Sequence, residues 1–264
     1  MAIPKKIHYC WLGRNPKPKS VLKCIESWRK FCPDYEIIEW NEDNLDISSN
    51  LFSRQAYEAK AWAFATDYFR LWIVYTHGGI YLDTDVQVIK PLDPLLEHRA
   101  FMGFETMEHI ATGLGFGAEA GSEFLAENMK LYDSLAFRNA DGTCNRLPAP
   151  AYSTEIARKH GLTNDTGEIQ TVLDLTCYPR EYFAPKDYFT GRLSVTKNTY
   201  SIHHYDSTWF TEEEQTRRKR DLLVARLRRI SYVPRALAEK LLGTKRYKHM
   251  VAAIKGLLPK GTGK

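Results

Sequence analysis

The chain has 264 residues, of which 44% are apolar and 12% aromatic, enough to bury a sizeable core in one large domain or a domain with an appendage, and this excludes a disordered protein. No window approaches the roughly 18 apolar residues of a membrane span, and the N-terminus lacks the apolar stretch of a signal peptide, so we expect a cytoplasmic protein. The five cysteines form an odd set without Cys-x-x-Cys spacing, which argues against a disulfide framework and a thiolate zinc site.

The first 40 residues predict the beginning of an α/β sheet. Residues 3–12 alternate apolar, basic and aromatic side chains, which is typical of a strand, and the turn-forming residues 13–16 end it. Residues 20–31 predict a helix, and residues 35–40 a second short strand. A strand, a helix and a strand in this order favour a sheet with helices packed on it.

A long helix is predicted next, from about residue 53 to residue 76, ended by the two glycines that follow His77. Asp67 and Arg70 lie three residues apart and therefore on one face of this helix. An intrahelical ion pair is the structural interpretation. A charged pair that faces a ligand is the functional one, and the helix alone does not decide between them.

Asp83 and Asp85 interrupt the apolar residues 78–90, which otherwise predict a buried strand. A buried carboxylate is costly unless a cation or hydrogen-bond donors neutralise it. Alternate positions of a strand share a face, so both side chains can meet one divalent ion if the strand opens at its end. Oxygen ligands suit Mn²⁺ or Mg²⁺, which often share substrate phosphates.

The next elements are less regular. Residues 101–105 predict a strand, and Ser122 caps a helix that runs to about residue 137. Between them, residues 111–118 carry three glycines at alternate positions, which we interpret as a wall of small residues that lets the backbone approach a ligand. Residues 194–205 predict a late strand, and it contains His203 and His204.

The positive charge of the chain is concentrated at its C-terminus. Residues 211–264 contain 15 Lys and Arg but 5 Asp and Glu, a net charge of +10, whereas the whole chain carries +5. Apolar residues recur at helical spacing in this segment and predict two or three short amphipathic helices. Peripheral contact with the inner face of an anionic membrane and packing on the main domain with a solvated basic face both explain it. The segment has few aromatics and no reader motif, which argues against nucleic-acid binding.

Several of these segments together resemble one family. The run from Asp67 and Arg70 to residues 78–85 resembles the sugar-binding, DXD-containing region of retaining glycosyltransferases, among them yeast-type mannosyltransferases and bacterial capsule and O-antigen hexosyltransferases. Residues 3–13 resemble the first strand of that family and residues 203–209 its closing segment. The resemblance spans residues 1–210.

The resemblance implies a fold and an activity. The fold is GT-A, a nucleotide-binding mixed, mostly parallel sheet flanked by helices, over residues 1–210, followed by the basic helical tail 211–264. The activity is metal-dependent transfer of a hexose with retention from a nucleotide-sugar, with UDP-sugars favoured, to a saccharide acceptor in bacterial surface-polysaccharide synthesis. Given the basic tail, we expect the acceptor to be lipid-linked.

The resemblance also implies roles for individual residues. The metal ligands would be Asp85, Asp83 through the water shell, and one of His203 and His204. Asp67 and Arg70 would hold the transferred sugar, and together with Asp83 they form the catalytic set. The donor-binding residues would be Tyr9, Trp11, Asp67, Arg70, Tyr81, Asp83, Ser207 and Trp209. Double displacement and front-face attack both remain open as routes to retention.

Two other classes of function compete with this one. A haloacid-dehalogenase-like phosphatase would use Asp83 as nucleophile and Asp85 as acid, but its motif normally has Thr or Val two residues further on, where this chain has Gln87. A non-catalytic membrane-binding module would explain the basic tail and leave the four charged residues Asp67, Arg70, Asp83 and Asp85 unexplained.

Overall fold

The computed structural model describes residues 2–206, 216–217, 220–224 and 241–257. The chain divides into two units, one of Met1–Lys186 with Ser194–Trp209 and one of Asp187–Leu193 with Phe210–Lys264. The domain boundary expected at residue 210 stays a prediction. Within the described ranges, no helix combines the length and hydrophobicity that a membrane span needs.

The beginning of the first unit follows the expected pattern. Strand β1 (Lys6–Cys10), helix α1 (Lys19–Phe31) and strand β2 (Glu36–Trp40) are close to the predicted elements. β1 and β2 pair in parallel, with Lys6 opposite Glu36 and Cys10 opposite Trp40. The local sequence signals were therefore sufficient for this part of the fold.

The predicted single helix over residues 53–76 is wrong, because the structure has two helices there. They are α2 (Leu51–Glu58) and α3 (Trp62–His77). Asn50 caps the N-terminus of α2, because its side chain accepts a hydrogen bond from the N–H of Ser53. Between the two helices Lys60 adopts a left-handed backbone conformation with φ of 57°, which redirects the chain. Neither glycine nor proline marks this break in the sequence, which is why helical periodicity concealed it.

The central sheet has the strand order β2-β1-β3-β7-β5-β9-β8, with β6 paired to β5 beside this path. β1, β2 and β3 run in the same direction, as do β5 and β9, whereas β7 and β8 are antiparallel to their neighbours. The prediction of a mixed, mostly parallel sheet flanked by helices is confirmed. The strands not yet given are β3 (Gly79–Tyr81), β5 (Ala100–Phe104), β6 (Ile110–Ala111), β7 (Phe116–Ala118), β8 (Gln170–Val172) and β9 (Leu175–Tyr178).

A second, two-stranded sheet corrects two further predictions. β4 (Val86–Val88) pairs antiparallel with β10 (Ser201–His203), so that Val86 lies opposite His203. The strand predicted over residues 78–90 is thus split between two sheets, and the late strand predicted over residues 194–205 is reduced to three residues. Asp83 and Asp85, separated by one residue, explain the split, because aspartate is unfavourable in a continuous buried strand.

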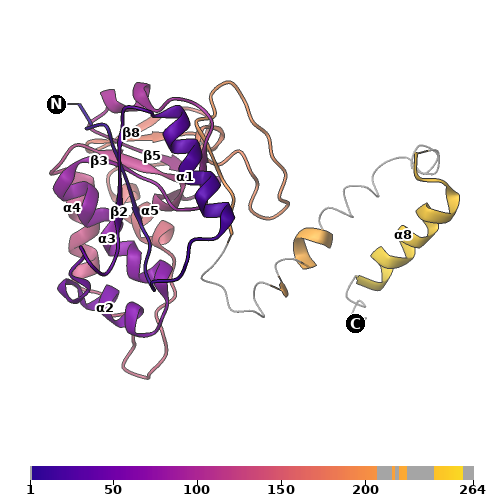
Figure 1. Cartoon of the computed structure of the whole chain (residues 1–264), viewed down its shortest axis with the longest axis horizontal. Coiled ribbons are helices and arrows are strands. Elements are labelled where there is room, and N and C mark those ends of the chain that lie inside the picture. The colour runs from indigo at the N-terminus through magenta and orange to yellow at the C-terminus, as the bar shows by residue number, and fades with distance from the viewer. Residues whose placement is uncertain (1, 207–215, 218–219, 225–240, 258–264) are drawn as a thin grey trace. The chain divides into compact units, whose positions relative to one another are not determined.

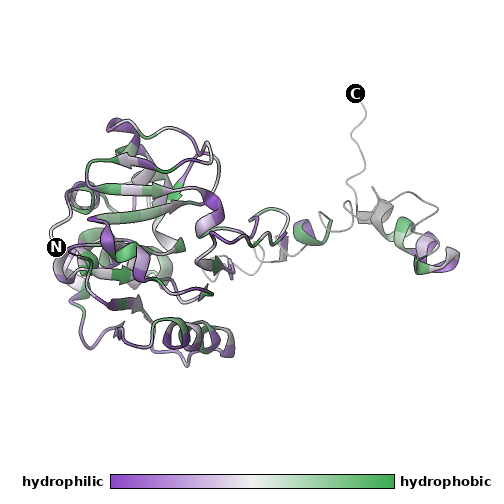
Figure 2. Cartoon of the chain, turned by 90° about the horizontal axis from the view of Figure 1, so that it is seen from above, coloured by the Kyte–Doolittle hydropathy of each residue, from purple (hydrophilic) through white to green (hydrophobic). Residues whose placement is uncertain are grey.

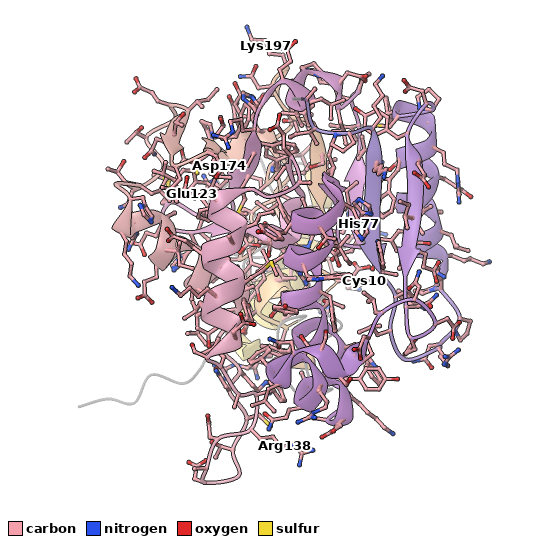
Figure 3. The ribbon with its side chains drawn as sticks, turned by 90° about the vertical axis from the view of Figure 1, so that its left-hand side faces the viewer. Cys10, His77, Glu123, Arg138, Asp174 and Lys197 are labelled. Carbon is pink, nitrogen blue, oxygen red and sulfur yellow. The ribbon has the colours of Figure 1, made fainter. Side chains whose placement is uncertain are left out.

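Helices cover the strands on two sides. Figure 1 shows α1 on one side and α3 with α4 (Glu123–Asp133) on the other, and the α3 side also carries α5 (Ala149–Lys159). The N–H groups of Glu123 and Phe124 donate to the carboxylate of Asp174, which lies at the beginning of α4 in Figure 3. The predicted helix from Ser122 ends at Asp133, earlier than expected. Short 3₁₀ helices span Ile47–Ser49, Asp93–Glu97, Thr112–Leu114 and Arg180–Tyr182, and α8 spans Thr244–Leu257.

The buried core lies between these layers, and Figure 2 shows hydrophobic residues along the strands and hydrophilic ones on outer helix turns. His8 of β1 is among the polar side chains that are fully buried. Its Nε2–H donates to the carbonyl oxygen of Gly78 at 2.9 Å, and its Nδ1 accepts from the indole N–H of Trp40 at 3.1 Å. Those two partners require a neutral ring, and burial lowers the pKa of His8 to about 4. His8 thereby anchors Gly78, which immediately precedes β3.

Candidate active site

The two aspartates lie in a turn that joins the two sheets. β3 ends at Tyr81 in the central sheet, and β4 begins at Val86 in the small one. The N–H of Val86 donates to the carbonyl oxygen of Asp83 at 3.0 Å, which closes the turn. Helix α1 supports the end of the turn where β4 begins, because the Trp28 indole N–H donates to the carbonyl oxygen of Val86 at 2.8 Å. The carboxylates of Asp83 and Asp85 are therefore held on a braced turn.

Three side chains converge at this turn. Single ligand atoms of Asp83, Asp85 and His203 lie within 4.8 Å of one another, and His203 Nε2 is 3.1 Å from Asp85 Oδ1. His204 is directed elsewhere, with Nε2 at 3.0 Å from Gln87 Oε1. Because adjacent residues of a strand point to opposite faces, the register of β10 brings His203 and not His204 to the aspartates.

The charges of Asp85 and His203 depend on each other. Burial alone would raise the pKa of Asp85, but the neighbouring His203 and the N–H of Asp206 hold that pKa well below its usual range. Burial alone would lower the pKa of His203, but the facing carboxylates, with Asp85 first, raise it to about 9. The protonated imidazole therefore serves as the counter-cation of a strongly anionic site.

A buried charged pair adjoins the cluster. Arg70 Nη2 lies 3.2 Å from Asp67 Oδ1, and Arg70 Nη1 lies 3.4 Å from Asp83 Oδ2. Thr66 and Thr112 hydroxyls also accept from the guanidinium, which rests over the buried ring of Tyr81 at 5.4 Å. Burial raises the pKa of Asp67 to about 7, against the opposing attraction of Arg70. The ion pair predicted within the helix is present, and it is linked to the aspartate turn.

Gly113 gives the aspartate turn its room. A Cβ atom added there would lie 2.7 Å from Asp83 Oδ2, closer than real Cβ contacts. The residue lies in the stretch 111–118, which the sequence predicted as a small-residue wall. The structure places that wall against the carboxylate of Asp83.

The residues predicted to bind the nucleotide are distributed around the end of β1. Tyr9 is buried, packs edge-on against Trp28 and donates its hydroxyl to Glu39 Oε2 at 2.5 Å. Trp11 is partly exposed, and the ammonium of Lys17 lies 5.8 Å from its ring centroid. Lys17 also pairs with Glu39 at 2.7 Å. Lys17 and Glu39 were missed at the sequence level because they lie in a loop and an edge strand without a motif.

Ser207 and Trp209 lie outside the described residues, so their roles stay predictions. The chain reaches that point from Asp206, whose N–H donates to Asp85 Oδ2 at 2.9 Å. Glu105 is a further residue that the sequence did not indicate. It follows β5 directly, and its Oε1 lies 3.9 Å from His203 Nδ1. A carboxylate at the end of a buried strand was the available signal, as it was for Asp83.

The donor set fits a divalent cation. Two carboxylates and one imidazole nitrogen suit Mn²⁺ well and Mg²⁺ through its oxygen ligands. In the structure, the protonated imidazole of His203 supplies the positive charge that faces the aspartates. A bound divalent cation can supply that charge instead, and His203 would then lose its Nε2 proton. We expect Asp83, Asp85 and His203 to hold the cation.

Comparison with known proteins agrees with this geometry. Residues 18–102 match the family described as "Glycosyltransferase sugar-binding region containing DXD motif". Inositol phosphoceramide mannosyltransferase 3 of Schizosaccharomyces pombe is 30% identical over 142 residues, which cover 52% of this chain and 39% of that protein. The initiation-specific α-1,6-mannosyltransferase of Candida albicans is 32% identical over 100 residues, 34% of this chain and 26% of that enzyme.

Two solved glycosyltransferases resemble the structure more distantly. The PaToxG glycosyltransferase has 18% identity and a TM-score of 0.47 over 60% of this chain and 70% of that one. A galactosyltransferase solved with donor and acceptor sugar analogues has 13% identity and a TM-score of 0.34 over 81% and 94%. The chain spans well under half the length of the curated relatives given above. The similarity to glycosyltransferase sugar-binding regions that contain a DXD motif is carried by residues 18–102, which include Asp67, Arg70, Asp83 and Asp85.

Proposed function

We propose that this chain is a metal-dependent, retaining glycosyltransferase that moves a hexose from a nucleotide-sugar to a saccharide acceptor. The convergence of Asp83, Asp85 and His203 beside the buried pair of Asp67 and Arg70 is the observation that carries the proposal. A metal site and a hydroxyl-binding pair next to each other are what a sugar diphosphate requires. The segment that carries Asp67, Arg70, Asp83 and Asp85 matches a family model of sugar-binding regions, which supports the proposal.

The site suits departure of a nucleoside diphosphate. Breaking the anomeric bond develops negative charge on the leaving phosphate, and a bound divalent cation supplies Lewis-acid stabilisation of that charge. Asp83 and Asp85 would hold the cation, and they lie on a turn that is fixed by both sheets, so little reorganisation of these residues would be needed. Arg70 adds a fixed positive charge 3.4 Å from Asp83.

The sugar would be held by Asp67 and Arg70. The carboxylate of Asp67 accepts hydrogen bonds from sugar hydroxyls and steadies the positive character that develops at the anomeric carbon. Arg70 orients that carboxylate at 3.2 Å. Retention of configuration follows from the family resemblance, and both double displacement and front-face attack satisfy it. Trapping of a glycosyl-enzyme by mass spectrometry distinguishes these two routes.

The donor and the acceptor are part of the same proposal. We retain a UDP-sugar as donor, and we add GDP-mannose to the candidates because the relatives named above are mannosyltransferases. The acceptor is a saccharide, lipid-linked at the cytoplasmic face of the membrane, in surface-polysaccharide synthesis in bacteria. Two features support a lipid-linked acceptor: the basic charge of residues 211–264, and a relative whose name includes inositol phosphoceramide. That relative is a yeast protein, and the bacterial setting is proposed from the sequence resemblance alone. Loss of residues 211–264 should then reduce binding to anionic vesicles, and unchanged binding would refute the membrane role.

The experiment that tests the activity is a panel of UDP- and GDP-sugars with Mn²⁺ and with EDTA, in which release of the nucleoside diphosphate is followed. We expect one donor to be turned over only with metal, and Asp85→Asn to lower that turnover at least about a hundredfold. Asp141→Asn, an exposed aspartate in a loop, is the matched control and should change little. If no donor binds with or without metal, the phosphatase and binding-module interpretations replace this proposal.

A further inference from the structure

Glu105 reaches the proposed metal site from a third element. It follows β5, and its backbone N–H donates to the carbonyl oxygen of His109 at 2.8 Å, which fixes the start of the loop. Its side chain is 21% exposed and points to His203, with Oε1 at 3.9 Å from Nδ1. The carboxylate thus lies on the side of the imidazole opposite the two aspartates.

The two nitrogens of His203 face different surroundings. Nε2 lies 3.1 Å from Asp85 Oδ1, inside the cluster. Nδ1 is buried, and within the described part of the chain it has no hydrogen-bond partner. A buried nitrogen of this kind has a cost in stability unless it finds a partner. A small rotation of Glu105 would close the gap of 3.9 Å to a hydrogen bond.

The ring of His203 is also restricted by packing. Its centroid lies 4.2 Å from that of the Tyr205 ring, and the residue is held by the pairing of β10 with β4. This contact restricts rotation of the ring, and in this conformation Nε2 is the nitrogen that faces the aspartates. The neutral imidazole has two tautomers, with the proton on Nδ1 or on Nε2. A carboxylate next to Nδ1 favours the Nδ1–H tautomer.

We propose that Glu105 is a positioning residue that accepts a hydrogen bond from His203 Nδ1–H and thereby directs the lone pair of Nε2 toward Asp83 and Asp85. The inference rests on the proposed metal site. Histidine ligands of metals generally donate their second N–H to such a group, and loss of that group typically weakens metal binding 10- to 100-fold. Glu105 acts through His203 and does not touch the reacting atoms.

Mn²⁺ affinity of the full chain without donor, measured by electron paramagnetic resonance, tests the role. We expect Glu105→Ala to weaken Mn²⁺ binding about 10- to 100-fold. Glu105→Gln keeps an acceptor oxygen in the same place, so it should lose less than Glu105→Ala does. Glu108→Gln removes an exposed negative charge three residues away and should stay within about twofold of wild type, which controls for long-range electrostatics.

The protonation of the ring gives a readout that a merely structural role would not move. In ¹⁵N-correlated spectra of the protein loaded with Zn²⁺, a diamagnetic ion that binds imidazole nitrogen, the Nδ1–H of His203 should exchange slowly with water in the wild type and faster in Glu105→Ala, because its hydrogen-bond acceptor is lost. Wild-type affinity in Glu105→Ala, an equal loss in Glu108→Gln, or exchange of the Nδ1–H at the same rate in the wild type and Glu105→Ala would each overturn the role of Glu105. A wild-type chain that binds no Mn²⁺ would instead overturn the metal site of the proposed function.

Discussion

His8 should make the fold sensitive to acid. In the unfolded chain an exposed histidine has a pKa near 6.5, whereas burial lowers the pKa of His8 to about 4 in the fold. Because the folded value is the lower one, the stabilisation is complete above about pH 6.5 and is lost as the pH falls toward 4. A difference of about 2.5 pKa units corresponds to roughly 3.4 kcal/mol, of which about 2.5 kcal/mol is lost by pH 4.5.

The structure explains why protonation is so unfavourable. Nδ1 accepts from the Trp40 indole N–H and Nε2–H donates to the Gly78 carbonyl, so a second ring proton would face the indole donor directly. Breaking that contact loosens the link between β1 and Gly78, the residue before β3. The aspartate turn follows β3 immediately, so acid should weaken the metal site before the whole domain unfolds.

Urea unfolding at pH 7.5 and pH 4.5 measures this effect, with His8→Gln as the reference. The glutamine amide can still donate to Gly78 but does not titrate in this range, and it leaves the Trp40 N–H unpaired. The variant should be less stable at pH 7.5 by about 1–3 kcal/mol. The unfolding free energy that the variant loses between pH 7.5 and pH 4.5 should be smaller than the wild-type loss by about 2.5 kcal/mol. The other titrating groups are the same in both proteins and cancel in this comparison. If both proteins lost the same unfolding free energy between pH 7.5 and pH 4.5, the argument about His8 would be refuted.

Three further outcomes are expected. Gly113→Ala should displace the Asp83 carboxylate and weaken Mn²⁺ binding in calorimetry while the thermal midpoint changes little; unaltered binding would contradict the close approach at this glycine. Asp67→Asn should depress transfer far more than nucleotide binding, and an equal loss in both would remove Asp67 from the sugar site. In the wild type, transfer should rise as the pH increases through about 7, where Asp67 ionises, and the variant should lack this rise. Trp28→Phe leaves the Val86 carbonyl without its donor, so it should lower stability by about 1–3 kcal/mol in urea unfolding, and a neutral effect would refute the bracing by α1.

Local signals predicted a large part of the fold. The first strand, helix and second strand were identified because their apolar periodicity is clear and turn residues bound them. The charged residues of the site were also identified, since Asp83 and Asp85 interrupt an apolar run and Asp67 and Arg70 share a helix face. Charge in an apolar segment is costly, so it indicates a candidate site without knowledge of the tertiary structure.

The sequence failed where long-range pairing decides the structure. The left-handed Lys60 breaks a helix without a local marker, and the aspartate turn lies between sheets because β4 pairs with β10 more than 100 residues away. The same pairing decides which histidine faces the aspartates, because a shift of one residue would exchange their faces. Glu105 was missed for the same reason, since its partner His203 is far away in sequence.

The pairing of β4 with β10 also has a consequence for biosynthesis. A ribosome releases the aspartate turn into solution well before it has made residues 201–203, so the nascent chain carries two of the three proposed ligands without the third. The sheet strands β1, β2 and β3 can pair during that interval, but the cluster cannot assemble. We therefore expect chains arrested before Ser201 to have formed the first three strands and to lack high-affinity metal binding, so competence would arise as one of the last steps of the folding of this unit.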